Sequence, residues 1–129
     1  MYMKKIVLIM ISILFICCSK DDEEPINYPL INTWKQIDIV TNGTSGKNVC
    51  NLKNSITFKD DNSWSWLNHK GENCELDTRG AYIGTWEEKS EGNYVLISSP
   101  NENFVMKKEN NKIEIQEVDE NPNTWIFKK

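Results

Sequence analysis

The chain has 129 residues, with 15 basic and 19 acidic side chains and a formal net charge of −4. Proteins that bind nucleic acid or adhere to anionic lipid by charge carry an excess of clustered basic residues, so this balance argues against both classes. The length is that of one domain.

The first segment has the features of an export signal. Lys4 and Lys5 precede an apolar run over residues 6–18, in which only Ser12 is polar, and residues 19–24 are then mostly acidic. A basic start, a short apolar core and small residues at its end are typical of a secretory signal. The run is shorter than the roughly 20 residues of a membrane-spanning helix. We therefore expect an exported protein.

The end of this segment, residues 15–18, resembles the lipobox of bacterial lipoproteins. Cys18 is the expected lipid acceptor, because Cys17 then fills the small position before it, whereas Cys17 as acceptor would put bulky Ile16 at the cleavage site. The following Ser-Lys-Asp-Asp resembles the sequence that directs lipoproteins of the Bacteroidetes to the cell surface. The resemblance implies a lipid anchor on Cys18 and a surface-exposed domain at the outer membrane. The alternative is a plain secreted protein with two incidental cysteines.

The expected organisation is a signal peptide over residues 1–17, an acylated, acidic tether over 18–28, and one domain over 29–129. Without Lys4 and Lys5, 13 basic residues face 19 acidic ones, and the net charge is −6. Repelling acids and Pro25 favour an extended tether.

Two cysteines remain in the domain, and an even pair in an oxidising compartment favours a disulfide. Cys50 and Cys74 flank a predicted hairpin whose turn lies near Asp61, eleven residues after one cysteine and thirteen before the other. This near-symmetry would bring them to the Cα separation of about 5.5 Å that a disulfide needs. The alternative is two free thiols. Zinc would need more ligands, and His69, the only histidine, lies in a polar stretch expected to be an exposed loop.

Short segments that alternate polar and apolar residues or are rich in β-branched ones fill the domain, and turn residues separate them. Eight strands are expected, over residues 34–40, 55–59, 63–66, 81–88, 93–98, 103–108, 112–118 and 124–128. No helical stripe lies between them. The sequence therefore predicts an all-β sandwich or barrel, and sequential hairpins favour an antiparallel meander that closes and so removes its edges.

Three short motifs carry a further resemblance. Residues 30–35 resemble the Leu-x-Gly-x-Trp opening of lipocalin-like lipoprotein domains of the Bacteroidetes, residues 57–64 resemble their Thr-x-Phe-x-x-Asp-Gly-x-Phe hairpin, and residues 84–86 their Gly-x-Trp strand. Asn32 stands where that family has its opening glycine, and Asp61-Asn62 where it has the turn glycine. Asparagine tolerates the left-handed backbone better than most residues, so the backbone can keep its course. The resemblance implies a small barrel that closes around an apolar ligand.

The aromatic residues are the candidate binding residues. We expect Trp34 and Trp86 to close the base of the barrel. Trp64 and Trp66 are either core, since aromatic side chains dominate cores by their buried area, or a platform for a ligand together with Tyr82 and Trp86.

No acid, base and nucleophile occur together, so we expect no enzyme, and we expect neither a cofactor nor a metal. Asp60, Asp61 and Asn62 offer too few oxygens for calcium, which needs about 6–8, and form a turn equally well. Two functions stay open for a monomeric surface lipoprotein. A hollow barrel would bind a small apolar or amphipathic molecule, whereas a packed barrel would contact a protein or glycan through loops and exposed aromatics.

Overall fold

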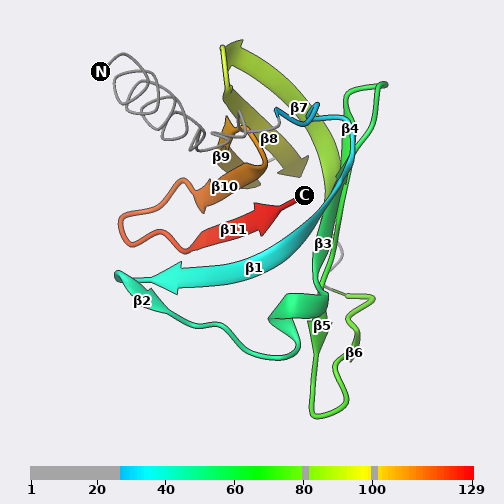
Figure 1. Cartoon of the computed structure of the whole chain (residues 1–129), viewed down its shortest axis with the longest axis vertical. Helices are drawn as coiled ribbons and strands as arrows, with labels where there is room; N and C mark the ends of the chain where they lie inside the picture. The colour runs from blue at the N-terminus through cyan, green and yellow to red at the C-terminus, as the bar shows by residue number, and fades with distance from the viewer. Residues whose placement is uncertain (1–26, 80–81, 100–101) are drawn as a thin grey trace, which may run out of the picture.

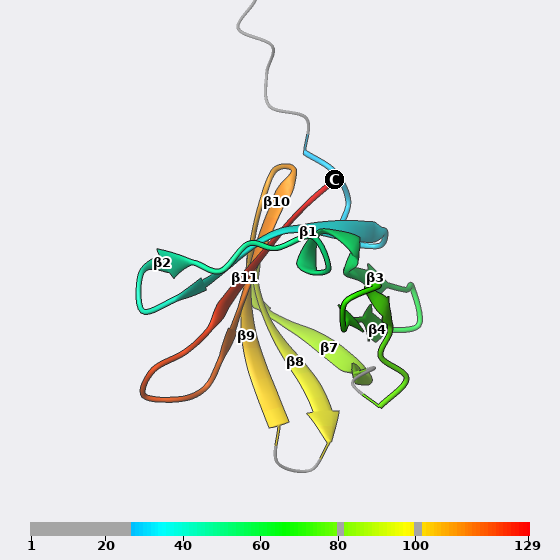
Figure 2. The same ribbon diagram turned by 90° about the horizontal axis from the view of Figure 1, so that it is seen from below.

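Eight antiparallel strands follow one another round a closed barrel in this computed structural model, which describes residues 27–79, 82–99 and 102–129 (Figures 1 and 2). The meander runs up to β11, which pairs with β1 and closes the barrel. The predicted all-β meander barrel is therefore confirmed. Its strands are β1 (Thr33–Thr41), β3 (Ser55–Phe58), β4 (Ser63–Leu67), β7 (Tyr82–Ser90), β8 (Asn93–Ser99), β9 (Glu102–Glu109), β10 (Lys112–Glu117) and β11 (Thr124–Lys128).

Residues with a left-handed backbone, in which φ is positive, form tight turns at the ends of several strands. Asn62 in the β3–β4 turn and Asn110 in the β9–β10 turn have φ of 61° and 48°. Asn42 and Gly43 both have positive φ and form the two-residue connection that hairpins favour. Asn62 thus adopts the left-handed backbone that asparagine tolerates better than most residues.

β1 closes the barrel because it pairs with two strands, β3 and β11. Its first residues pair with β3, as in Trp34 opposite Ile56, and its later residues pair with β11, as in Ile39 opposite Trp125. The register shifts between Gln36 and Asp38, so one extra residue bulges there. Such a bulge bends and twists a strand, which lets β1 turn from one neighbour to the other.

Inward-facing side chains fill the barrel. Trp34, Trp64 and Trp66 are each at most 2% exposed. Between them pack smaller apolar side chains that come from every other strand except β7, namely Ile56, Phe58, Leu96, Phe104, Met106, Ile113, Ile115 and Phe127. Of the two barrels considered from the sequence, hollow and packed, the structure shows the packed one.

Four short elements lie outside the barrel and were not predicted from the sequence: β2 (Thr44–Ser45), the 3₁₀ turn η1 (Asn51–Lys53), β5 (His69–Lys70) and β6 (Glu75–Leu76). η1 is the only helical element among the described residues, in agreement with the expected lack of helix. β5 and β6 pair with each other in an insertion between β4 and β7. We call residues 48–53 and 68–77, which a disulfide joins, the disulfide lobe.

The two ends of the barrel differ. At the end that we call the base, the N-terminal segment meets the tight turns of the meander; there Trp34 Nε1 donates to the carbonyl of Leu30 at 3.0 Å and Lys108 Nζ to Asn27 Oδ1 at 2.7 Å. At the opposite end, the mouth, lie the disulfide lobe and the β10–β11 loop. The lobe hangs from the ends of β3 and β4 in Figure 1.

Candidate functional site at the barrel mouth

Four aromatic rings form one layer across the barrel near its mouth. Trp66, Tyr82, Phe104 and Trp125 come from β4, β7, β9 and β11, and we call them the mouth layer. Trp66 contacts the other three, with ring centroids 6.0 Å from Tyr82, 6.3 Å from Phe104 and 5.1 Å from Trp125. Several pairs meet edge to face, which is the arrangement that the ring quadrupole favours. The layer is therefore a rigid floor beneath the mouth.

Trp66 lies at the centre of this layer with an unused hydrogen-bond donor. Its Nε1–H is buried and has no acceptor among the described residues. By contrast, Trp64, two residues earlier on the same strand face, donates its Nε1–H to the carbonyl of Thr85 at 3.0 Å. Leaving a buried donor unpaired costs about 1–3 kcal/mol. The mouth layer thus keeps a polar group that packing alone does not require.

A cleft of about 540 Å³ opens beside the mouth layer. It lies where β7 and β9 begin and β10 ends, and Tyr82 and Phe104 of the mouth layer form part of its wall. Val118 adds an apolar side chain that is 69% exposed. The polar lining comes from Asn103, Glu117 and Asp119.

Glu117 reaches this cleft from the inner face of the barrel, because it pairs across the sheet with inward-facing Phe104. Asn123, in the β10–β11 loop, donates its Nδ2–H to Glu117 Oε2 at 3.3 Å. Asn123 Oδ1 in turn accepts a hydrogen bond from Thr41 Oγ1 at 2.6 Å. This chain of contacts fixes one carboxylate at the rim.

The apolar lining of the cleft continues onto the outer wall of the barrel, where Val95 and Val105 border it. Val95 faces Val105 across β8 and β9, and Ile97 lies on the same face two residues after Val95. Ile83 on β7 is 67% exposed. We call Ile83, Val95, Ile97 and Val105 the outer patch. Exposed apolar groups that gather on one face are typical of a contact surface.

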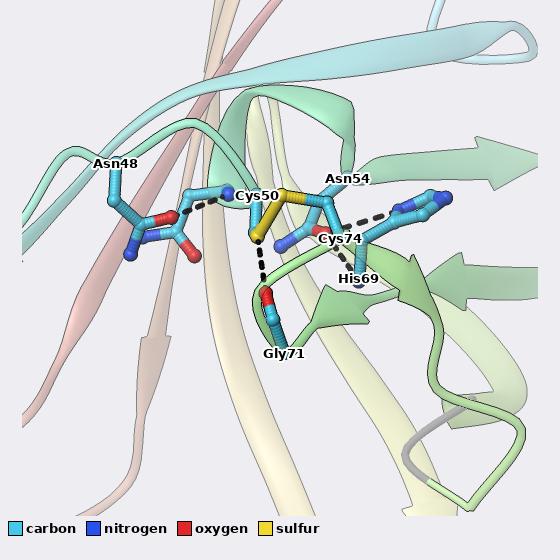
Figure 3. The surroundings of a disulfide bond; sticks show 7 residues. Asn48, Cys50, Asn54, His69, Gly71 and Cys74 are labelled. Atoms are coloured by element: carbon cyan, nitrogen blue, oxygen red, sulfur yellow. Dashed lines mark hydrogen bonds between the residues drawn. A yellow bond between two sulfur atoms is a disulfide. The ribbon is translucent and has the colours of Figure 1, made fainter.

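The disulfide lobe borders the mouth on the other side. Cys50 and Cys74 form a disulfide with a Cα separation of 4.9 Å, which confirms the predicted bridge (Figure 3). Beside it, the buried Asn54 side chain accepts a hydrogen bond from the His69 backbone amide at 2.7 Å and donates to Gln36 Oε1 at 3.0 Å. His69 is half-buried in this network, so the expected exposed loop is wrong at that position.

The base holds a second aromatic pair. Trp86 and Tyr94 meet edge to face with centroids 5.9 Å apart. Partial burial raises the pKa of the Tyr94 hydroxyl, and the charge of nearby Glu88 and its hydrogen bond raise the pKa further. The Nε1–H of Trp86 is buried without an acceptor among the described residues.

The residues that the sequence singled out are therefore divided between the two ends. Of the four proposed ligand contacts, Tyr82 lines the mouth cleft and Trp66 is buried and packs on Tyr82, whereas Trp64 is fully buried and Trp86 lies toward the base. Trp34 is fully buried at the base. Cys18 lies outside the described residues.

Sequence reasoning missed Phe104, Glu117 and Trp125 as mouth residues. Phe104 sits in an alternating strand and Trp125 in an Asn-Thr-Trp segment like that around Trp34, so both were identified as strand residues but not placed at an end. The signal that could have found them is pairing across β9, β10 and β11, in which Phe104 lies opposite Glu117.

Within residues 27–79, 82–99 and 102–129, no three side chains of His, Cys, Asp or Glu gather as a metal site. The same ranges contain no helix that is long and apolar enough to cross a membrane.

Comparison with models of protein families, with curated proteins and with solved structures gives no match to this chain.

Proposed function

We propose that this protein is a lipid-anchored, non-catalytic binding module that takes a small amphipathic molecule in the mouth cleft. The observation that carries this proposal is the contrast between the packed interior and the open mouth. Aromatic and aliphatic side chains fill the barrel, so the small molecule that a hollow barrel would have enclosed binds instead in the open cleft beside the mouth layer. The cleft of about 540 Å³ has a suitable size, since small-molecule pockets span roughly 300–1,000 Å³.

The placement of the chain's first described residues supports the display of this cleft. Residues 27–32 run along the base, so a lipid on Cys18 would hold the base toward the membrane. The acidic tether would then space the barrel from the bilayer, and the mouth would face away from it. The lipobox-like residues 15–18 and the Ser-Lys-Asp-Asp that follows them support an outer-membrane lipoprotein.

The outer patch favours a second candidate, an interaction module that contacts another protein through its wall. Ile83 and Val105 are exposed on adjacent parts of this face. In this alternative the packed barrel is a scaffold and the mouth cleft is not used.

Two exposed positions separate these functions without disturbing the core. Val118 lines the cleft and Ile83 belongs to the outer patch, and both side chains are about two-thirds exposed. We expect Val118→Asn, which replaces aliphatic surface with a neutral polar group, to abolish the co-purification of small molecules, measured by mass spectrometry of organic extracts of the purified protein. Val49→Asn is a matched control, because Val49 is 71% exposed and lies in the disulfide lobe.

Ile83→Glu should leave the extracted small molecules unchanged. If Ile83→Glu instead abolishes capture of a protein partner while Val118→Asn has no effect on any bound molecule, the interaction module replaces the ligand-binding one.

The anchor has its own test. Cys18→Ala should leave the protein unprocessed or soluble in membrane fractionation and without incorporated fatty acid. Normal acylation of this variant would refute Cys18 as the acceptor.

A further inference from the structure

The charged side chains that line the mouth cleft are all acidic. Glu117 and Asp119 both contribute to its lining, and the described lining residues include no lysine, arginine or histidine. Two carboxylates that face a common space without a basic partner produce a negative potential there, and partly apolar walls concentrate it.

Both carboxylates keep acceptor capacity for a ligand. One oxygen of Glu117 accepts from Asn123 Nδ2, and one oxygen of Asp119 accepts from the backbone amide of Glu120. A carboxylate has about four lone-pair sites over its two oxygens, so one such contact leaves most of them open.

The remaining walls suit an apolar body with a positive charge. Tyr82 and Phe104 present aromatic rings, and a cation within about 6 Å of a ring centroid is attracted by the ring quadrupole. Val118 supplies aliphatic surface at the rim. The rings of Tyr82 and Phe104 also pack on Trp66, whose buried Nε1–H has no acceptor among the described residues. The wall of the cleft beside the carboxylates is thus partly aromatic.

We propose that the mouth cleft binds an organic cation with an apolar body, such as a small alkyl- or arylammonium compound. The ammonium group lies between Glu117 and Asp119, and the apolar part packs on Tyr82, Phe104 and Val118. This assignment rests on the proposed function, because it names the ligand class for that same cleft. An anionic amphiphile would be repelled by the two carboxylates, and a neutral one could gain hydrogen bonds from them but no charge attraction.

The test compares three probes of similar size on the full-length chain in a non-ionic detergent. Benzyltrimethylammonium is the cation, benzenesulfonate the anion, and methyl glucoside the neutral probe. Binding is followed by calorimetry and by the fluorescence of the tryptophans. We expect the cation to bind at least tenfold more tightly than either other probe, and added salt to weaken its binding.

Two substitutions locate the effect. The double variant E117Q/D119N should lower the affinity for benzyltrimethylammonium at least tenfold, because it removes both charges with little change of shape. Glu109→Gln is the matched control: it removes an exposed carboxylate at the base and should leave the affinity unchanged.

Each result decides between the two proposals. If benzenesulfonate or methyl glucoside binds as tightly as the cation and Val118→Asn abolishes that binding, the cation assignment is overturned while the mouth remains the binding site. If the cation binds equally well to E117Q/D119N, the assignment is also overturned. If no probe binds to the unmodified protein, both the assignment and the proposed binding function fail.

Discussion

The backbone amide of His69 donates a 2.7 Å hydrogen bond to Oδ1 of Asn54, and this contact joins the disulfide lobe to the barrel wall. Asn54 passes the connection on to Gln36, which is buried on β1 next to the bulge. A polar network thus spans from the closing strand of the barrel to an insertion at its mouth. In a buried setting such a network specifies one arrangement, because each unpaired member is costly.

Asn54→Ala should therefore destabilise the protein by about 2–3 kcal/mol, because it leaves the buried Gln36 oxygen and the His69 amide without their partner. Urea unfolding measures the change in the free energy of unfolding. Asn48→Ala is the control, since Asn48 is exposed and makes one 2.9 Å contact to the Asn51 amide. Its loss should be no more than about 1 kcal/mol. Equal losses in the two variants would contradict the role of the network.

The disulfide should contribute a large share of the stability. Its two cysteines are 24 residues apart, and a loop of that length stabilises by about 3 kcal/mol in the chain-entropy model. The variant with both Cys50 and Cys74 changed to Ser should lose about this amount in urea unfolding. Thiol titration of the denatured, unreduced domain should detect neither Cys50 nor Cys74 as a free thiol, and detection of both would refute the bridge.

The strands of the barrel could be predicted because their chemistry is local. Polar and apolar residues alternate in 55–58 and 63–66, on both sides of an Asp-Asp-Asn turn. Such a hairpin can be predicted from its own residues, without the rest of the chain. β5 and β6 could not be predicted in this way, because each has two residues and lies in a polar stretch without apolar alternation. Their pairing depends on positive φ at Gly71 and Cys74, and on a disulfide to a distant residue.

The site was predictable only in part for a related reason. Trp64 and Trp66 share one strand face, so alternation cannot tell which of them lies nearer the mouth. That distinction depends on the pairing of β4 with β7 and on the closure between β1 and β11. Likewise, Glu117 reaches the cleft because β10 pairs with β9 in one register, and a shift by one residue would turn it to the outer face.

Trp34→Phe and Trp66→Phe form a matched pair, since both remove an indole from the packed interior. Trp34 also loses its hydrogen bond to the Leu30 carbonyl, whereas the Nε1–H of Trp66 has no acceptor among the described residues. We expect Trp34→Phe to cost about 1 kcal/mol more than Trp66→Phe in urea unfolding. A larger loss in Trp66→Phe would mean that its Nε1–H has a partner in solution.

The raised pKa of Tyr94 predicts a loss of stability at alkaline pH. Burial is its main cause, and the charge of Glu88 adds to it. Between the ordinary tyrosine pKa and the raised one, the unfolded chain has released the proton while the folded protein still binds it. The stability contribution is therefore fully present below about pH 10 and falls as the pH rises through the folded pKa. In urea unfolding from pH 8 to 11, Tyr94→Phe should lose less stability than the unmodified protein. Parallel curves would contradict this role.

Gly84 should be the glycine that tolerates substitution least. A Cβ atom placed on it would lie 1.8 Å from the Ile97 carbonyl oxygen and 2.9 Å from the Ser98 Cα, and neither backbone atom can move unless β7 and β8 separate. Gly84→Ala should therefore cost about 3 kcal/mol or more, at the upper end of what overpacking costs. Gly71→Ala is the control, because φ there is +81° but nothing lies within 4 Å of the added atom, so only backbone strain of about 1–2 kcal/mol is expected. Urea unfolding of both variants gives the order directly. If Gly84→Ala proved no more costly than Gly71→Ala, the close approach of β7 and β8 at this position would be wrong.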